Sequence, residues 1–107
     1  MEDVSVILRE RGDRYGSFDS HARITYGIKG VMQASPNWVG GKLSYSQREA
    51  LDMVAHKIGR ILNGDPNYID SWRDLCGYSQ LIVNELMGTD GASDAKVAKF
   101  ELGYRGG

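Results

Sequence analysis

The sequence of 107 residues has a single cysteine, two prolines and no long apolar run. One cysteine excludes an intrachain disulfide framework and a cysteine-rich zinc site built from one chain. No segment approaches the roughly 20 apolar residues of a membrane span, and the N-terminus has no signal-peptide pattern. We therefore expect a cytoplasmic protein with no membrane partner. A net charge of −1 gives no overall basic field, so the sequence carries no strong nucleic-acid signal.

Helical periodicity is what the sequence does contain. Apolar residues recur every three or four positions, and no segment alternates as a strand does. We predict an all-α fold of about four helices, in one domain over residues 1–88 followed by a Gly-rich flexible tail over residues 89–107. The helices are expected at about residues 2–10, 19–34, 46–62 and 69–87.

Local signals set these boundaries. Gly12 and Gly16 are expected to break the first helix, and Pro36 with the Gly40-Gly41 pair predicts a loop. Two caps are predicted, namely Asp19 or Ser20 for the second helix and a capping box of Ser46 with Glu49 for the third.

Each of the last two helices has one apolar face, which we predict to be core. In the third helix that face is Leu51, Val54, Ala55, Ile58, Ile61 and Leu62, and in the fourth it is Trp72, Leu75, Cys76, Ser79, Ile82, Val83 and Leu86. The opposite faces are charged, which is typical of solvated surface. They nevertheless contain Met53, Leu81 and the mid-helix Gly77, which indicates cover by another helix, a second subunit or a ligand. A homodimer that covers Met53 and Leu81 is the corresponding expectation.

Asp70 and Asp74 stand one helical turn apart, where like charges repel. A cation between them and the acids of the preceding helix, Glu49 and Asp52, would remove that conflict. Oxygen ligands favour Mg²⁺ or Mn²⁺, and the nearby Lys57 and Arg60 suit phosphate. The alternative is an arginine in place of the metal. In a strict antiparallel hairpin the two acid pairs would lie at opposite ends, so a metal site requires a shifted register or a twofold partner.

The segment "RGDRYGSFDSHAR" opens the second helix. Its Arg14 could contact phosphate and its Tyr15 a base or ribose. Equally, Tyr15 and Phe18 could fill the core while Arg14 pairs with an acid. His21 falls on an apolar stripe and is expected to be structural. His56 falls on the acidic stripe and is the candidate functional histidine.

Two segments, "REALDMVAHKIGRILNGDPNYIDSWRDLCGY" and "RGDRYGSFDSHARI", resemble small phage and prophage proteins of uncharacterised function. Those proteins resemble in turn the nucleotide-modification-associated domain and the MazG-like nucleoside triphosphate pyrophosphohydrolases. The resemblance covers roughly residues 11–86. It implies an oligomeric all-α domain that binds Mg²⁺ through an ExxE and an ExxD motif. It further implies hydrolysis of a nucleoside triphosphate to the monophosphate and pyrophosphate, in the host cytoplasm if the chain is phage-encoded.

Carried over to this chain, ExxE falls on Glu49 and Asp52, while ExxD keeps its last acid at Asp74 but has Ser71 at its first position, beside Asp70. The metal ligands expected are thus Glu49, Asp52, Asp70 and Asp74, with Glu49 and Asp52 also catalytic. Substrate contacts are assigned to Arg14, Tyr15, His56, Lys57, Arg60 and Tyr78. The alternative function is a non-enzymatic phage protein that binds and inhibits a host protein, which the Ser71 departure and the small size favour.

Overall fold

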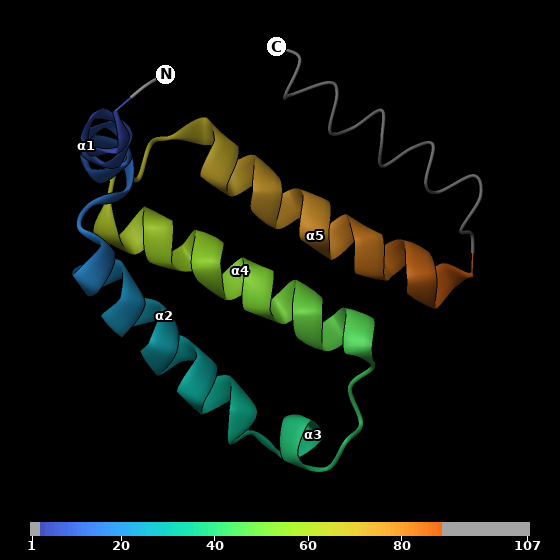
Figure 1. Ribbon diagram of the computed structural model, residues 1–107. Coiled ribbons are helices and arrows are strands. Elements are labelled where there is room, and N and C mark those ends of the chain that lie inside the picture. Colours follow the sequence, from blue (N-terminus) through green and yellow to red (C-terminus); the bar gives the residue numbers. More distant parts are fainter. Residues whose placement is uncertain (1–2, 89–107) are drawn as a thin grey trace.

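The computed structural model describes residues 3–88, and every regular element in that range is a helix. The prediction of an all-α fold is therefore confirmed. The predicted tail, residues 89–107, lies outside the described residues. The five helices are α1 (Val4–Tyr15), α2 (Phe18–Gln33), α3 (Pro36–Val39), α4 (Tyr45–Asn63) and α5 (Ile69–Met87) (Figure 1).

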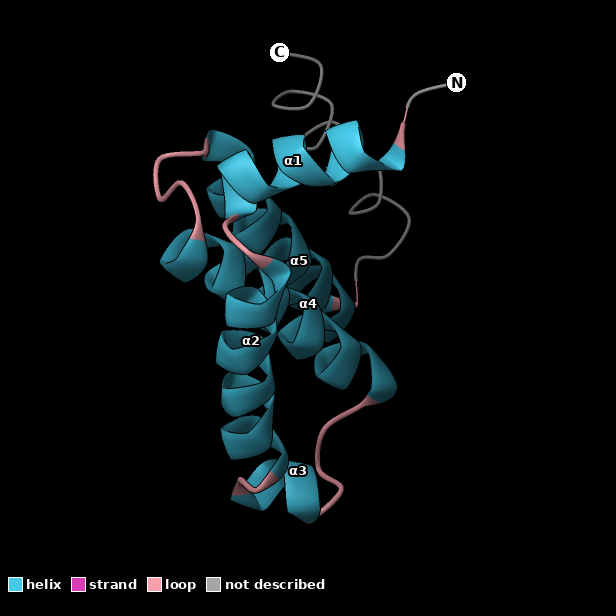
Figure 2. Ribbon diagram, turned by 60° about the vertical axis from the view of Figure 1, so that its left-hand side comes forward, coloured by secondary structure: helices cyan, strands magenta, loops and turns pink. Residues whose placement is uncertain are grey.

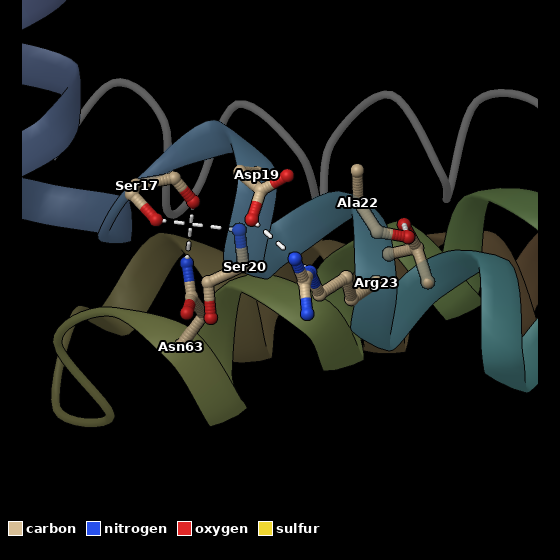
Figure 3. Close-up of polar contacts among 7 residues, drawn as sticks. Ser17, Asp19, Ser20, Ala22, Arg23 and Asn63 are labelled. Carbon is tan, nitrogen blue, oxygen red and sulfur yellow. Dashed lines mark hydrogen bonds and ion pairs between the residues drawn. The ribbon is translucent and has the colours of Figure 1, made fainter.

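The predicted end of the first helix and the predicted N-cap of the second helix are both wrong. Helix α1 continues through Gly12 to Tyr15 and ends only at Gly16, whose φ of 81° few side chains tolerate. Ser17, rather than Asp19 or Ser20, is the N-cap of α2, because its Oγ accepts a hydrogen bond from the Ser20 backbone N–H at 3.3 Å (Figure 3). A single glycine in a helix costs too little to stop it when the flanking residues still favour the helix.

Two further boundaries differ from the prediction. Pro36 begins the single turn of α3 within the predicted loop, since its fixed φ suits the first helical position. The capping box of α4 pairs Ser44 with Gln47, two residues before the predicted Ser46–Glu49 pair. Both pairs have the spacing of a capping box, so the sequence contains two overlapping candidates for it. The last helix ends where predicted, at Gly88 in the left-handed conformation.

Helix α4 lies in the middle of the molecule, packed against α2 on one side and α5 on the other. Helices α2 and α5 share no comparable contact, so the three helices form a single bent layer rather than a closed bundle (Figures 1 and 2). Helix α1 crosses one end of this layer, close to the point where α4 ends and α5 begins.

Helices α4 and α5 are strictly antiparallel. Ser46 Oγ donates to Glu85 Oε1 at 2.9 Å at one end, and Lys57 Nζ lies 3.0 Å from Asp74 Oδ2 nearer the other. The two pairs have the same sum of residue numbers, so the register is constant along the hairpin.

The predicted core face of α5 is wrong, and that of α4 is confirmed as fully buried only at Ala55. The buried residues of α5 are Ser71, Gly77 and Asn84, all outside its apolar face, whereas Trp72 on that face is 50% exposed. Helix α4 buries Ala55, Lys57 and Gly59, while its apolar Leu51 and Leu62 are exposed. Among the described residues Ala55 is the one buried hydrophobic residue. A single layer of helices has no interior in which larger apolar side chains could be enclosed.

No helix within the described range is long and apolar enough to cross a membrane.

Candidate functional site

The turn between α1 and α2 is docked on the end of α4. The Asn63 side-chain amide donates to the carbonyl oxygens of Tyr15 and Ser17, each at 2.9 Å, and Figure 3 shows the second bond. The Asp65 backbone N–H donates to the Arg14 carbonyl at 2.8 Å. A Cβ on Gly64 would overlap the backbone of Arg14 and Tyr15, so this approach requires glycine. The RYG and NGDP segments, 48 residues apart, thus form one structural unit.

This unit carries a cluster of three arginines and two tyrosines, which we name the Arg–Tyr cluster: Arg11, Arg14, Tyr15, Arg60 and Tyr68. The guanidinium of Arg60 lies 4.3 Å from the Tyr15 ring centroid and that of Arg11 lies 5.7 Å away. Arg14 lies 4.7 Å from the Tyr68 ring, and the two tyrosine rings meet edge to face at 6.1 Å. Guanidiniums held against aromatic faces keep their N–H groups available for a further partner.

Two pockets open on either side of Tyr15 and Arg60. The polar pocket has a volume of about 260 Å³ and lies between the start of α5 and the end of α4; its lining is Tyr15, Lys57, Arg60, Tyr68, Asp70, Ser71 and Asp74. The aromatic pocket, of about 430 Å³, lies under α1 and the start of α2, and its lining includes Arg11, Tyr15, Phe18, His21, His56 and Arg60. Tyr15 and Arg60 line both pockets, so the two are adjacent.

The stacked acids of α5 face α4. Asp74 pairs with Lys57 at 3.0 Å, with the two side chains 12% and 10% exposed. Asp70 accepts a hydrogen bond from the Tyr68 hydroxyl at 3.1 Å. Burial, together with this bond to Asp70, raises the pKa of the Tyr68 hydroxyl. Lys57 is therefore a cation that pairs with Asp74.

His56 and His21 lie between α4 and α2. Their rings stack with centroids 5.8 Å apart, and Lys29 Nζ lies 2.9 Å from His56 Nε2. Burial lowers the pKa of both imidazoles, and the charge of Lys29 lowers the pKa of His56 further. Because an ammonium can only donate, His56 Nε2 accepts from Lys29 as a neutral ring. His56 thus takes part in the α2–α4 contact while one edge lines the aromatic pocket.

The four predicted metal ligands are not brought together in the described part of the chain. With the antiparallel register, Asp70 lies opposite residue 61, twelve residues from Glu49, which is roughly 18 Å along the helix axis. Asp52 lies one turn before His56 on α4, and its carboxylate partly opposes the lowering of the His56 pKa. No group of three or more His, Cys, Asp or Glu side chains in residues 3–88 could hold a metal ion. These residues do not fit a resident Mg²⁺ within one chain.

The other predicted contacts divide between two ends of the molecule. Arg14, Tyr15, His56, Lys57 and Arg60 line or adjoin the two pockets. Tyr78 lies instead beside a groove of about 530 Å³ at the opposite end of the α4–α5 hairpin, with Met53, Leu81 and Glu49. Met53 and Leu81 line this groove together, and Leu81 is still 37% exposed, so their cover by a second subunit stays a prediction.

Arg11 and Tyr68 belong to this site but were not among the substrate contacts assigned from the sequence. Tyr68 could have been found from its position two residues after the NGDP turn. That turn contacts the RYG segment, and the contact brings Tyr68 into the cluster. No protein-family model, curated protein or solved structure matches this chain.

Proposed function

We propose that this protein binds a nucleotide across the two pockets beside Tyr15 and Arg60. The phosphates contact Arg60 and Arg11, and the base lies in the aromatic pocket against Tyr15, Phe18 or His21. The observation that carries the proposal is the Arg–Tyr cluster at the junction of a polar and an aromatic pocket. A nucleotide has an anionic end and a flat aromatic end. The first matches the arginines of this site and the second matches its aromatic side chains.

The charges at this site support an anionic ligand. Two ion pairs of the described residues are Lys57–Asp74 and Arg23–Asp19, and neither involves an arginine of the cluster. Asp70 and Asp74 line the polar pocket together with Lys57 and Arg60 and offset their charge, so Arg11 and Arg14 are the cations of the cluster outside that balance. Phosphate oxygens are the acceptors that best match a guanidinium fork.

Hydrolysis is a separate question from binding. The resemblance to MazG-like proteins implies a Mg²⁺-dependent pyrophosphohydrolase, but the carboxylates of residues 3–88 do not gather into a metal site. We therefore assign to Lys57 and Asp74 a structural role at the wall of the polar pocket. The same observation favours a second candidate function, a non-enzymatic protein that inhibits a host protein.

Calorimetric titration of the full chain tests the proposal. The probes are ATP, inorganic tripolyphosphate and adenosine, each with and without Mg²⁺. We expect ATP to bind more tightly than either fragment, because only ATP fills both pockets. Arg60→Gln should weaken ATP binding roughly 10- to 100-fold, since a hydrogen bond to a charged group contributes about 1.5–3 kcal/mol.

Arg23→Gln is the matched control. Arg23 is an arginine on the exposed side of α2, paired with Asp19, and it lines neither pocket. Its substitution should leave ATP binding unchanged. If no probe binds at millimolar concentration under any condition, the nucleotide proposal is wrong and the host-protein function is the one left to test.

A further inference from the structure

The apolar stripes of α4 and α5 lie on the same side of the helical layer. They meet at a groove of about 310 Å³ that is lined almost entirely by apolar atoms, with Leu51 and Val54 on one wall and Ser79 and Ile82 on the other. We name the surface around this groove the outer face: Leu51, Val54, Ile58 and Leu62 of α4 with Trp72, Leu75, Ile82 and Leu86 of α5.

The outer face is exposed to an extent that is unusual for large apolar residues. Leu62 is 66% exposed and Leu86 is 72% exposed, while the half-buried members are Val54, Ile58, Leu75 and Ile82. No large side chain of residues 3–88 is fully buried, so this part of the chain has no enclosed core. A helical domain normally encloses its apolar stripes between two layers, and the described helices supply one layer.

We propose that a second copy of this chain covers the outer face, so that two α4–α5 hairpins form a four-helix bundle around a shared core. The area fits a stable dimer. The exposed parts of these side chains amount to on the order of 600 Å². A standard interface buries roughly 800 Å² per partner, and residues that adjoin the outer face would supply the difference. Two antiparallel hairpins stacked face to face are a common arrangement of four-helix bundles.

The charge pattern points to self-association rather than to a different partner. In a twofold dimer the same surface meets its own copy, so charges close to the axis would face like charges. The outer face carries none, whereas the opposite side of α4 carries Glu49, Asp52 and Arg60. A partner that completes the core must also be present whenever the chain folds. A second copy of the chain meets this condition, because it is made together with the first.

This dimer is independent of the nucleotide proposal, and it has a consequence for it. The groove of the outer face adjoins the groove that Glu49 lines, because Ala50, Tyr78 and Ile82 line both. No residue of the outer face lines the polar or the aromatic pocket, so a dimer formed through this face would use neither pocket's lining.

Light scattering of the full chain after size-exclusion chromatography tests the dimer. We expect a mass twice the 11.8 kDa of one chain. Leu86→Glu should shift the protein to monomer, because it places two carboxylates in an apolar interface. Leu86 is largely exposed in the single chain, so the substitution removes little packing within it. Two control variants, Leu81→Glu in the groove that Glu49 lines and Tyr26→Glu on the exposed side of α2, should remain dimeric.

A second measurement does not depend on a variant that folds. In a Trp38→Phe background the emission of Trp72 reports on its own exposure. We expect acrylamide quenching of Trp72 to increase on dilution as the dimer dissociates. A wild-type monomer over the whole concentration range overturns the proposal. A monomer with shielded Trp72 would mean that residues 89–107 cover the face instead. Dissociation by Leu81→Glu but not by Leu86→Glu would overturn the proposal and place the interface at the groove that Glu49 and Leu81 line.

Discussion

The side of α5 that faces α4 and the side that faces away from it differ in residue size and in polarity. The inner side has Ser71, Asp74 and Asn84, and the outer side has Trp72 and Leu86. Within one chain the small and polar residues are the buried ones. This difference teaches that contacts inside the chain set helix position and charge pairing, whereas most of the large apolar side chains stay exposed.

The inner side should be the more sensitive of the two to a change of charge. Asp74→Asn leaves the buried Lys57 ammonium without its counter-charge, so we expect a loss of about 3–5 kcal/mol in the free energy of unfolding. Urea denaturation measures it. The matched control is Asp19→Asn, which breaks the 3.1 Å pair with Arg23 on the surface, where the side chains are 79% and 80% exposed. That change should cost below about 0.5 kcal/mol.

A double variant sharpens the same comparison. Lys57→Met with Asp74→Leu removes both charges and keeps similar volume, so most of the stability lost in Asp74→Asn should return. If Asp74→Asn is as stable as the wild type, Lys57 is not dependent on this carboxylate and the inner side is not an electrostatic contact.

The contact of α4 with α2 should respond to size rather than to charge. A Cβ on Gly59 would lie within 3.0 Å of His21 Cε1 and closer still to the Thr25 methyl group. Gly59→Ala should therefore destabilise the fold by about 1–3 kcal/mol, although alanine favours a helix intrinsically. The control is Gly30→Ala, where nothing lies near the added Cβ and we expect stabilisation. A stabilised Gly59→Ala would contradict close packing at this crossing.

The smallest expected effect is a pH dependence at the same contact. The pKa of His21 and of His56 is lowered in the folded chain by burial. The unfolded chain therefore binds protons more readily below about pH 6.5, and stability should fall as the pH drops from 6.5 through the lowered pKa values. Thermal melts at pH 7.5 and 5.5 measure this, and a variant with both His21→Gln and His56→Gln should show a smaller difference. An equal pH effect in that variant would assign it to other groups.

Part of the candidate site could be predicted from the sequence. Arg14, Tyr15, Lys57 and Arg60 were identified from local motif and charge, and they lie at or beside the two pockets. Tyr78 was assigned by its position beside the acidic stripe, but the antiparallel register carries it toward the far end of the hairpin. The distance between a residue of one helix and a residue of its paired helix depends on the register of the two helices. The residue types alone do not reveal that register.

The sequence by itself determined the helical periodicity, the end of α5 at Gly88 and the presence of two glycine-bearing turns, because these depend on residues within a few positions of one another. Only the tertiary structure decided which side of each helix faces its neighbour. Periodicity shows that α4 and α5 each have an apolar side, but it does not show whether that side packs inside one chain or against another. Here the Lys57–Asp74 pair and the small Ser71 bring the polar sides together, and the apolar sides remain outside.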